Sequence, residues 1–181
     1  MVPLLGWDRS FPYKIADICL GKSQLEDREF LQRCLNAAYH YLSYRPRSEE
    51  EIRQWLRQHG FDKGIVEKAI DRLKEQNLSN DFAFAQFWKE SRLSAKPRSK
   101  RLISKELKDK RVAPEIIEQV TKDIDDEENA HRLGLGRMHA LANLDYPDFQ
   151  RRLSNYLIYR GFTYEVIKRT IATLWQEKVQ H

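Results

Sequence analysis

The fold of this chain is decided by the stretch Pro46-Arg-Ser-Glu-Glu-Glu-Ile52, which returns as Pro97-Arg-Ser-Lys-Arg-Leu-Ile103. A third copy begins at Pro147, so the chain is built on a repeat of about 50 residues. The positions that follow each proline keep the same spacing in all three copies, and only Thr170 among them is polar. They are Ile52, Leu56, Phe61, Ile65, Val66, Ala69 and Leu73; Ile103, Leu107, Val112, Ile116, Ile117, Val120 and Ile124; and Leu153, Leu157, Phe162, Val166, Ile167, Thr170 and Leu174.

Each copy carries the signals of three helices. Ser48 followed by Glu51 is a capping box, which marks the start of a helix. Another apolar-periodic segment precedes each such start, beginning at Leu31 in the first copy. The sequence therefore predicts an all-α fold of three tandem three-helix repeats, stacked into an elongated, curved array in which neighbours supply part of each other's core. The expected boundaries are an N-terminal extension at 1–27, without a structural assignment, and repeats at 28–79, 80–126 and 127–181.

The turn inside each repeat has its own signature. Gly60 suits the left-handed conformation that ends a helix, and we expect Phe61 after it to pack back on Leu56. The third copy repeats this pair as Gly161-Phe162. The middle copy has Arg111 in place of the glycine, which predicts a strained or differently shaped turn.

Composition and charge indicate a soluble, basic, cytoplasmic protein. The chain has 181 residues, of which 33% are charged and 41% hydrophobic, and its formal net charge is +5. No apolar run approaches the ~20 residues that span a bilayer, and the first residues do not resemble a secretory signal. The two cysteines, Cys19 and Cys34, are too few for a disulfide framework. Cys34 falls on an apolar helix face, which favours a buried, inert thiol.

Motifs for the common catalytic and metal chemistries do not occur in the sequence. We find no phosphate-binding loop, no Cys-x-x-Cys pair and no His-Glu-x-x-His. His131 and His139 could share a helix face, but no further ligand stands nearby. The acidic run 123–128 lacks the glycine turn and spaced ligands of a calcium loop, which favours a solvated helix junction. We therefore expect no enzymatic activity, no metal and no nucleotide cofactor.

Cationic residues concentrate in a belt from Lys89 to Arg111. The belt holds ten cationic and three acidic residues, whereas the stretch 115–128 after it holds seven acidic residues and one cation. Such a belt favours contact with phosphates or with an acidic partner, and the alternative is a solvated helix face. The candidate binding residues, in the belt and the first repeat, are Arg45, Arg47, Arg53, Arg57, Arg92, Lys96, Arg98, Lys100, Arg101, Lys105 and Lys108.

Four cations of the belt are spaced by three and four residues. They are Arg98, Arg101, Lys105 and Lys108. On a helix this spacing would place them in one row, turned away from the apolar Ile103 and Leu107. A row of this kind would follow phosphates rather than read bases, because flexible lysines act as point charges.

Several longer motifs of the chain match those of a known family. They are Tyr41-Leu-Ser-Tyr-Arg-Pro-Arg-Ser-Glu-Glu-Glu-Ile-Arg-Gln-Trp-Leu56, Gly60-Phe-Asp62, Leu73-Lys-Glu-Gln-Asn-Leu-Ser-Asn-Asp-Phe-Ala83, Ser91-Arg92, Pro97-Arg-Ser99, Ile103-Ser-Lys-Glu-Leu107 and Arg160-Gly-Phe-Thr-Tyr-Glu-Val-Ile167. Through them the chain resembles the RecX family of recombination regulators over about residues 30–176. The third repeat is more divergent, with Asp148 where the others have Arg47 and Arg98.

The resemblance implies three tandem three-helix repeats and a regulator of the bacterial RecA recombinase. It implies that the protein usually restrains RecA, by binding along the groove of the RecA nucleoprotein filament on single-stranded DNA. The alternative is a general helical nucleic-acid-binding module without a recombinase target. The acidic stretch beside the belt favours the regulator, because it would repel bare DNA but could pair with a basic protein patch. We expect a monomer whose contacts with DNA phosphates are weak and salt-dependent.

Overall fold

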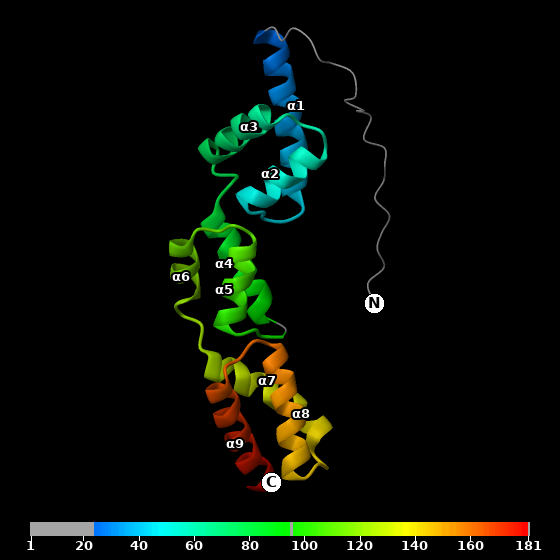
Figure 1. The fold of residues 1–181 in the computed structure, drawn as a ribbon, viewed down its shortest axis with the longest axis vertical. Helices are drawn as coiled ribbons and strands as arrows, with labels where there is room; N and C mark the ends of the chain where they lie inside the picture. The colour runs from blue at the N-terminus through cyan, green and yellow to red at the C-terminus, as the bar shows by residue number, and fades with distance from the viewer. Residues whose placement is uncertain (1–23, 95, 181) are drawn as a thin grey trace.

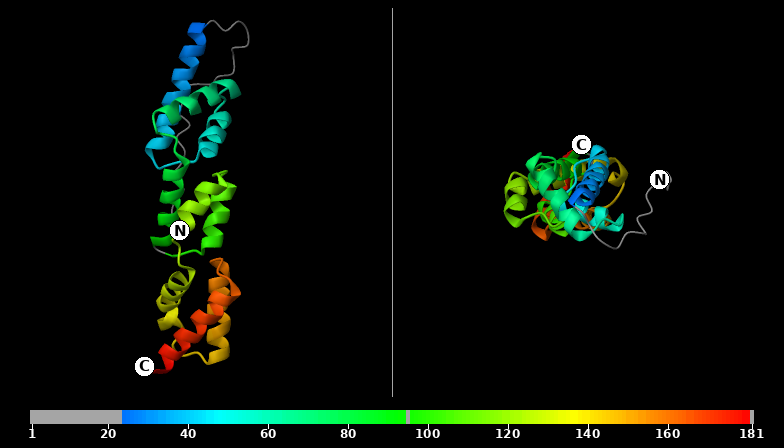
Figure 2. Two further views of the ribbon diagram at one scale, coloured as in Figure 1. Left: turned by 90° about the vertical axis from the view of Figure 1, so that its left-hand side faces the viewer. Right: turned by 90° about the horizontal axis from the view of Figure 1, so that it is seen from above.

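The chain forms a line of three helical bundles (Figure 1). This computed structural model describes residues 24–94 and 96–180, so Cys19 and most of the N-terminal extension lie outside the described residues. All regular structure within that part is helical, which confirms the prediction of three tandem three-helix repeats. The bundles are α1 (Gln24–Ser43), α2 (Glu49–Gln58) and α3 (Lys63–Glu75); α4 (Asp81–Ser94), α5 (Lys100–Asp109) and α6 (Pro114–Thr121); and α7 (Asp126–Leu141), α8 (Tyr146–Tyr159) and α9 (Tyr164–Gln180). Seen along its long axis in Figure 2, the array is about one bundle wide.

A serine hydroxyl begins the second helix of the first two bundles. Ser48 Oγ accepts a hydrogen bond from the backbone N–H of Glu51 at 3.2 Å, and the carboxylate of Glu51 accepts one from the backbone N–H of Ser48 at 3.4 Å. This is the predicted capping box. Ser99 caps α5 with the same kind of bond. The third bundle differs, because Asp145 caps α8 and Pro147 lies inside the first turn of the helix instead of before the cap.

The turn after each second helix has one geometry in all three bundles. The backbone N–H of Phe61 bonds to the carbonyl of Leu56 at 3.2 Å, and the equivalent bonds are Val112–Leu107 at 3.2 Å and Phe162–Leu157 at 3.3 Å. Gly60 and Gly161 have φ of 87° and 89°, and Arg111 adopts a φ of 61°. The middle turn therefore keeps the common shape at a cost of about 1–2 kcal/mol, because a side chain disfavours this left-handed conformation.

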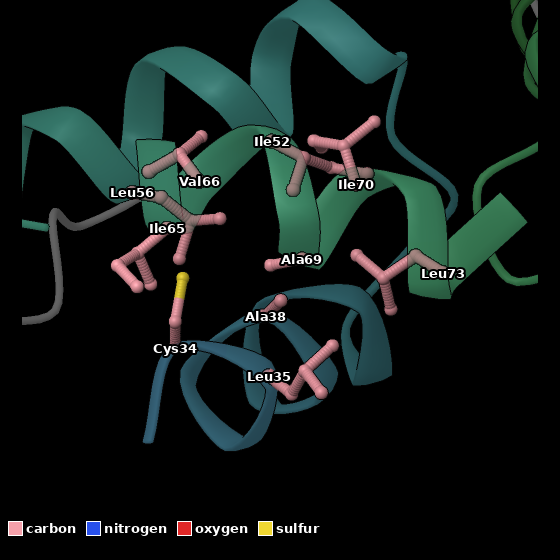
Figure 3. Close-up of a cluster of buried hydrophobic side chains, with 10 residues drawn as sticks. All are labelled: Cys34, Leu35, Ala38, Ile52, Leu56, Ile65, Val66, Ala69, Ile70 and Leu73. Carbon is pink, nitrogen blue, oxygen red and sulfur yellow. The ribbon is translucent and has the colours of Figure 1, made fainter. Parts of the chain in front are cut away.

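Each bundle has an apolar core of its own. The core of the first bundle is shown in Figure 3 and consists of Cys34, Leu35 and Ala38 from α1, Ile52 and Leu56 from α2, and Ile65, Val66, Ala69, Ile70 and Leu73 from α3. The second core contains Phe84, and the third contains Phe149. Cys34 is fully buried, as expected, and burial raises the pKa of its thiol to about 12.

Polar contacts join one bundle to the next. We expected neighbouring repeats to share part of a core, but the three apolar clusters are separate. Instead, Asp81 at the start of α4 accepts a hydrogen bond from the backbone N–H of Glu49 at 2.9 Å. Asp126 at the start of α7 accepts one from the backbone N–H of Lys100 at 2.7 Å. Because a helix leaves its first N–H groups unpaired, each aspartate caps a helix of the preceding bundle.

Candidate polyanion-binding surface

Exposed cations of the second bundle lie along α5. Arg101, Lys105 and Lys108 are exposed on one side of this helix, and Ile103 and Leu107 are fully buried on the other. In the part of the chain that the structure describes, Lys105 and Lys108 have no ion-pair partner. We call these three cations the α5 row. The charges of Lys105 and Lys108 face solvent and are available to a binding partner, and Arg101 stands at the end of the row nearest the third bundle.

Arg98 does not extend this row. It precedes the N-cap Ser99, outside the helix, and forms an ion pair with Glu106. Glu106 also accepts hydrogen bonds from Arg92 Nε and Trp88 Nε1, each at 2.8 Å. Burial alone would raise the pKa of Glu106, but these hydrogen bonds outweigh it and hold the pKa below its usual value. Arg92 and Arg98 are therefore engaged in the packing of the second bundle.

The four candidate arginines of the first bundle are engaged within that bundle too. Three form ion pairs: Arg45–Glu51 at 3.1 Å, Arg53–Glu67 at 3.0 Å and Arg57–Glu67 at 3.3 Å. Arg47 places its guanidinium carbon 4.1 Å from the ring centroid of Tyr41. Three of these four charges are therefore paired, whereas Arg47 packs on Tyr41 and has no ion-pair partner among the described residues.

The beginning of α5 lies against the third bundle. Arg101 Nε donates a hydrogen bond to the carbonyl of Gly161 at 3.3 Å, and Arg160 Nη1 donates one to the carbonyl of Lys96 at 3.2 Å. The backbone N–H of Ser99 bonds to the carbonyl of Arg160 at 3.0 Å. The turn at 160–161 is thus held against the segment 96–101. Lys96 and Lys100 are both exposed at this second junction.

Three arginines that the belt pattern did not single out lie in the third bundle near this junction. They are Arg132, Arg137 and Arg160. None of the three has an ion-pair partner among the residues described. One sequence signal could have found two of them, because no acidic residue stands three or four positions from Arg137 or Arg160. On a helix such an arginine has no local carboxylate to pair with.

The acidic run 123–128 forms the link between the second and third bundles. Asp125 caps α7 by accepting hydrogen bonds from the backbone N–H groups of Glu127 at 2.8 Å and Glu128 at 3.0 Å. The run is therefore a helix junction, as expected. Over residues 24–94 and 96–180 no cluster of three or more histidine, cysteine, aspartate or glutamate side chains is arranged to hold a metal ion. None of the helices described there is both long and apolar enough to span a membrane.

Fold and surface together define a class of protein. It is a helical-repeat protein in which, over the described residues, most cations without an ion-pair partner lie on the second bundle and at its junction with the third. A surface of this kind suits contact with a polyanion.

The chain belongs to the RecX family, as its motifs suggested. Residues 34–73, 80–120 and 125–171 match the first, second and third three-helix domains of RecX. The chain is 31% identical over 156 residues to the regulatory protein RecX of Amycolatopsis mediterranei (strain U-32), covering 82% of this chain and 89% of the relative. It is 32% identical over 143 residues to the regulatory protein RecX of Prosthecochloris aestuarii, covering 79% of this chain and 94% of the relative.

Other relatives are longer, and solved structures share the fold. The regulatory protein RecX of Listeria monocytogenes (strain EGD-e) is 29% identical over 148 residues, and the match covers 80% of this chain but only 55% of that protein. The crystal structure of RecX from Lactobacillus salivarius superposes with a TM-score of 0.71 at 23% identity, over 81% of this chain and 97% of that one. The last comparison establishes the fold alone.

Proposed function

We propose that this chain regulates the RecA recombinase, restraining it by binding to its nucleoprotein filament on single-stranded DNA. The observation that carries the proposal is the α5 row, an exposed line of cations in a member of a family of regulatory proteins. A row of flexible side chains follows phosphates without reading bases. A regulator that acts on a filament assembled on any DNA sequence needs this kind of contact.

The acidic surface of the second bundle supports a partner that presents protein as well as phosphate. Glu115 and Glu118 on α6 are exposed, and neither has an ion-pair partner within the described part of the chain. These carboxylates would repel bare DNA, whereas a basic patch of a protein could pair with them. A nucleoprotein filament offers both kinds of surface.

The shape of the array also supports lengthwise contact with a filament. Three bundles follow one another along a single axis (Figures 1 and 2), so the chain presents an extended surface that meets several subunits at once. We propose that one copy of the chain acts as a monomer in the cytoplasm. It would act without a catalytic group, metal or nucleotide of its own.

The alternative function is a general helical nucleic-acid-binding module with no recombinase target. The α5 row alone is compatible with this function, because phosphate contact does not require a protein partner, whereas membership of the family and the acidic residues of α6 favour the regulator. The two functions differ in what excess DNA would do. A general module binds bare DNA as tightly as it binds the filament and is relieved by more DNA, whereas a filament regulator binds the filament more tightly and is relieved far less.

RecA ATP hydrolysis on single-stranded DNA, measured across a titration of this protein, tests the proposal. We expect hydrolysis to fall saturably and to stay reduced when free single-stranded DNA is added in excess. Recovery of hydrolysis on adding DNA would favour the general module. Unchanged hydrolysis at every concentration of the protein would contradict the proposed function.

A further inference from the structure

A cleft of about 360 Å³ lies between the second and third bundles. One wall comes from Ser94 at the end of α4 and from Lys96 and Pro97, and the other comes from α7 and α8. The polar side chains that line it include Lys96, Arg132, Arg137 and Tyr156. Gly136 lies in the α7 wall, where an added Cβ would meet nothing within 4 Å, so the cleft is open on that side.

The cleft carries uncompensated positive charge. Among the residues that the structure describes, none of those lining it is acidic, and its three cations have no ion-pair partner. The guanidinium of Arg132 donates instead to neutral acceptors, the carbonyl of Leu93 at 2.8 Å and Asn129 Oδ1 at 3.2 Å. These bonds hold the side chain in place and leave its charge unmatched. Like charges in one cleft repel each other, and an anion bound between them would relieve that repulsion.

Two guanidinium groups lie near the ring of Tyr156, that of Arg137 in the cleft and that of Arg160 beside it. The guanidinium carbon of Arg137 is 4.4 Å from the ring centroid of Tyr156, and that of Arg160 is 5.4 Å from it. Arg160 Nε is buried and has no hydrogen-bond partner in the described chain. Stacking on a ring orients a guanidinium and reduces the freedom that it would lose on binding an anion. The donors of the cleft therefore come from several segments and are partly pre-oriented.

This arrangement fits a phosphate group better than a carboxylate. A phosphate is tetrahedral and accepts hydrogen bonds from several directions, which matches donors on α7 and on the loop at Lys96. A carboxylate is planar and is satisfied by one forked guanidinium. The cleft also adjoins the α5 row, because Arg160 binds the carbonyl of Lys96 while Arg101 binds the carbonyl of the neighbouring Gly161. A chain of phosphates that passes along α5 would reach the cleft next.

We propose that this cleft is a phosphate-binding site that takes a backbone phosphate of single-stranded nucleic acid. The proposal rests on the proposed function, since it assumes that the protein meets DNA. The site extends phosphate contact from the α5 row of the second bundle to the third bundle. Inorganic phosphate shares the chemistry of the ligand and is the second possible source.

The site is tested by the side-chain Nε–H signals of arginine in nuclear magnetic resonance spectra of the full chain. The probes are an oligothymidylate, inorganic phosphate and polyglutamate, compared at equal concentration of negative charge. We expect the signals of Arg132 and Arg137 to shift saturably with the oligothymidylate, weakly with inorganic phosphate and not with polyglutamate. Equal shifts with polyglutamate would overturn the choice of phosphate. Shifts with inorganic phosphate alone would overturn the nucleic-acid backbone as the ligand.

The same spectra separate failure of the site from failure of the proposed function. A shift of Arg101 on α5 without any shift of Arg132 or Arg137 would overturn the cleft and leave DNA contact intact. If the oligothymidylate moves no arginine signal and RecA hydrolysis is also unchanged by the protein, the proposed function fails along with the cleft.

A cleft variant and a control variant far from the cleft give an independent readout. Arg137→Gln removes one cation of the cleft that makes no hydrogen bond to the residues described, and Arg72→Gln removes an exposed arginine of the first bundle. We expect Arg137→Gln to weaken oligothymidylate binding and to reduce the slope of log affinity against log salt by about 0.7, the value for one neutralised phosphate of a single strand. We expect Arg72→Gln to leave the slope unchanged. Equal slopes for Arg137→Gln and the unmodified chain would overturn the site.

Discussion

Asp126 Oδ1 accepts a hydrogen bond from the backbone N–H of Lys100 at 2.7 Å, so the first residue of the third bundle caps a helix of the second. Asp81 and Glu49 repeat this relationship at the first junction, at 2.9 Å. Because the bundles do not share a core, these bonds help to decide how each bundle sits on its neighbour. They therefore help to place the α5 row beside the cationic cleft.

Removing this cap should destabilise the second bundle. We expect Asp126→Ala to lower the free energy of unfolding by about 1 kcal/mol, the usual cost of losing a helix cap. Asp126→Asn keeps an acceptor oxygen and should cost less. Urea denaturation of the two variants checks this. Equal losses for both would mean that the acceptor at residue 126 does not cap α5.

The same carboxylate should make the stability of the chain depend on pH. Burial raises the pKa of Asp126, and this effect outweighs the hydrogen bond from Lys100 that lowers it. Because the folded state then binds the proton more tightly than the unfolded state, protonation of Asp126 stabilises the fold. This contribution to the free energy of unfolding is complete below the unfolded pKa of about 3.9 and is lost as the pH rises through the folded pKa. The unmodified chain should therefore lose stability relative to Asp126→Asn as the pH rises from about 3.5 to about 7, a range that begins near the unfolded pKa of an aspartate and extends above it. A difference in the free energy of unfolding that is constant over that range would contradict the expected raised pKa.

Two glycines of equal conformation should differ in their tolerance of a side chain. Gly60 and Gly161 both have positive φ, but a Cβ on Gly161 would lie 2.7 Å from both Leu102 Cβ and Ser99 Oγ, whereas a Cβ on Gly60 would meet nothing within 4 Å. Gly60→Ala should cost about 1–2 kcal/mol from the backbone alone. Gly161→Ala should cost clearly more, because it also pushes the third bundle off α5. Thermal melts that fall equally for both would show that the second junction is not packed this closely.

The phenylalanines that follow these glycines should differ as well. The repeat pattern predicts equivalent anchors at Phe61 and Phe162, but Phe162 is 3% exposed and Phe61 is only partly buried. Phe162→Ala should cost about 3–5 kcal/mol, as large-to-small changes in a core do. Phe61→Ala should cost less, because its ring already contacts solvent. The order of the two urea midpoints checks this, and the reverse order would contradict the burial that we describe.

Local features of the fold could be predicted from the sequence, because they depend on residues within one turn of each other. The capping box of Ser48 and Glu51 and the left-handed turn at Gly60 are examples. The presence of Arg111 where the other repeats have glycine also predicted backbone strain at this turn, although the turn keeps its shape.

The candidate site was harder to predict, because ion pairing depends on contacts between helices. The spacing of Arg98 predicts that it belongs to an exposed row. In the structure it forms an ion pair with Glu106, which also pairs with Arg92 of α4. Arg132 and Arg137 stand far from the belt in sequence and reach Lys96 only because the third bundle packs on the second. The residue spacing within one helix cannot predict such a contact between bundles.

The most direct test of the central claim is the salt dependence of binding to the RecA filament on single-stranded DNA. The variant Lys105→Glu with Lys108→Glu reverses two charges of the α5 row that are unpaired among the described residues, and Lys63→Glu with Lys168→Glu makes the same change of charge on α3 and α9. Both variants should fold normally, since exposed substitutions usually change stability by less than about 0.5 kcal/mol. We expect only the α5 variant to bind more weakly, with a salt slope reduced by about 0.7 for each phosphate that it no longer neutralises. If the α5 variant binds and restrains the filament as the unmodified chain does at every salt concentration, the α5 row is a solvated face that does not contact the phosphates of the filament.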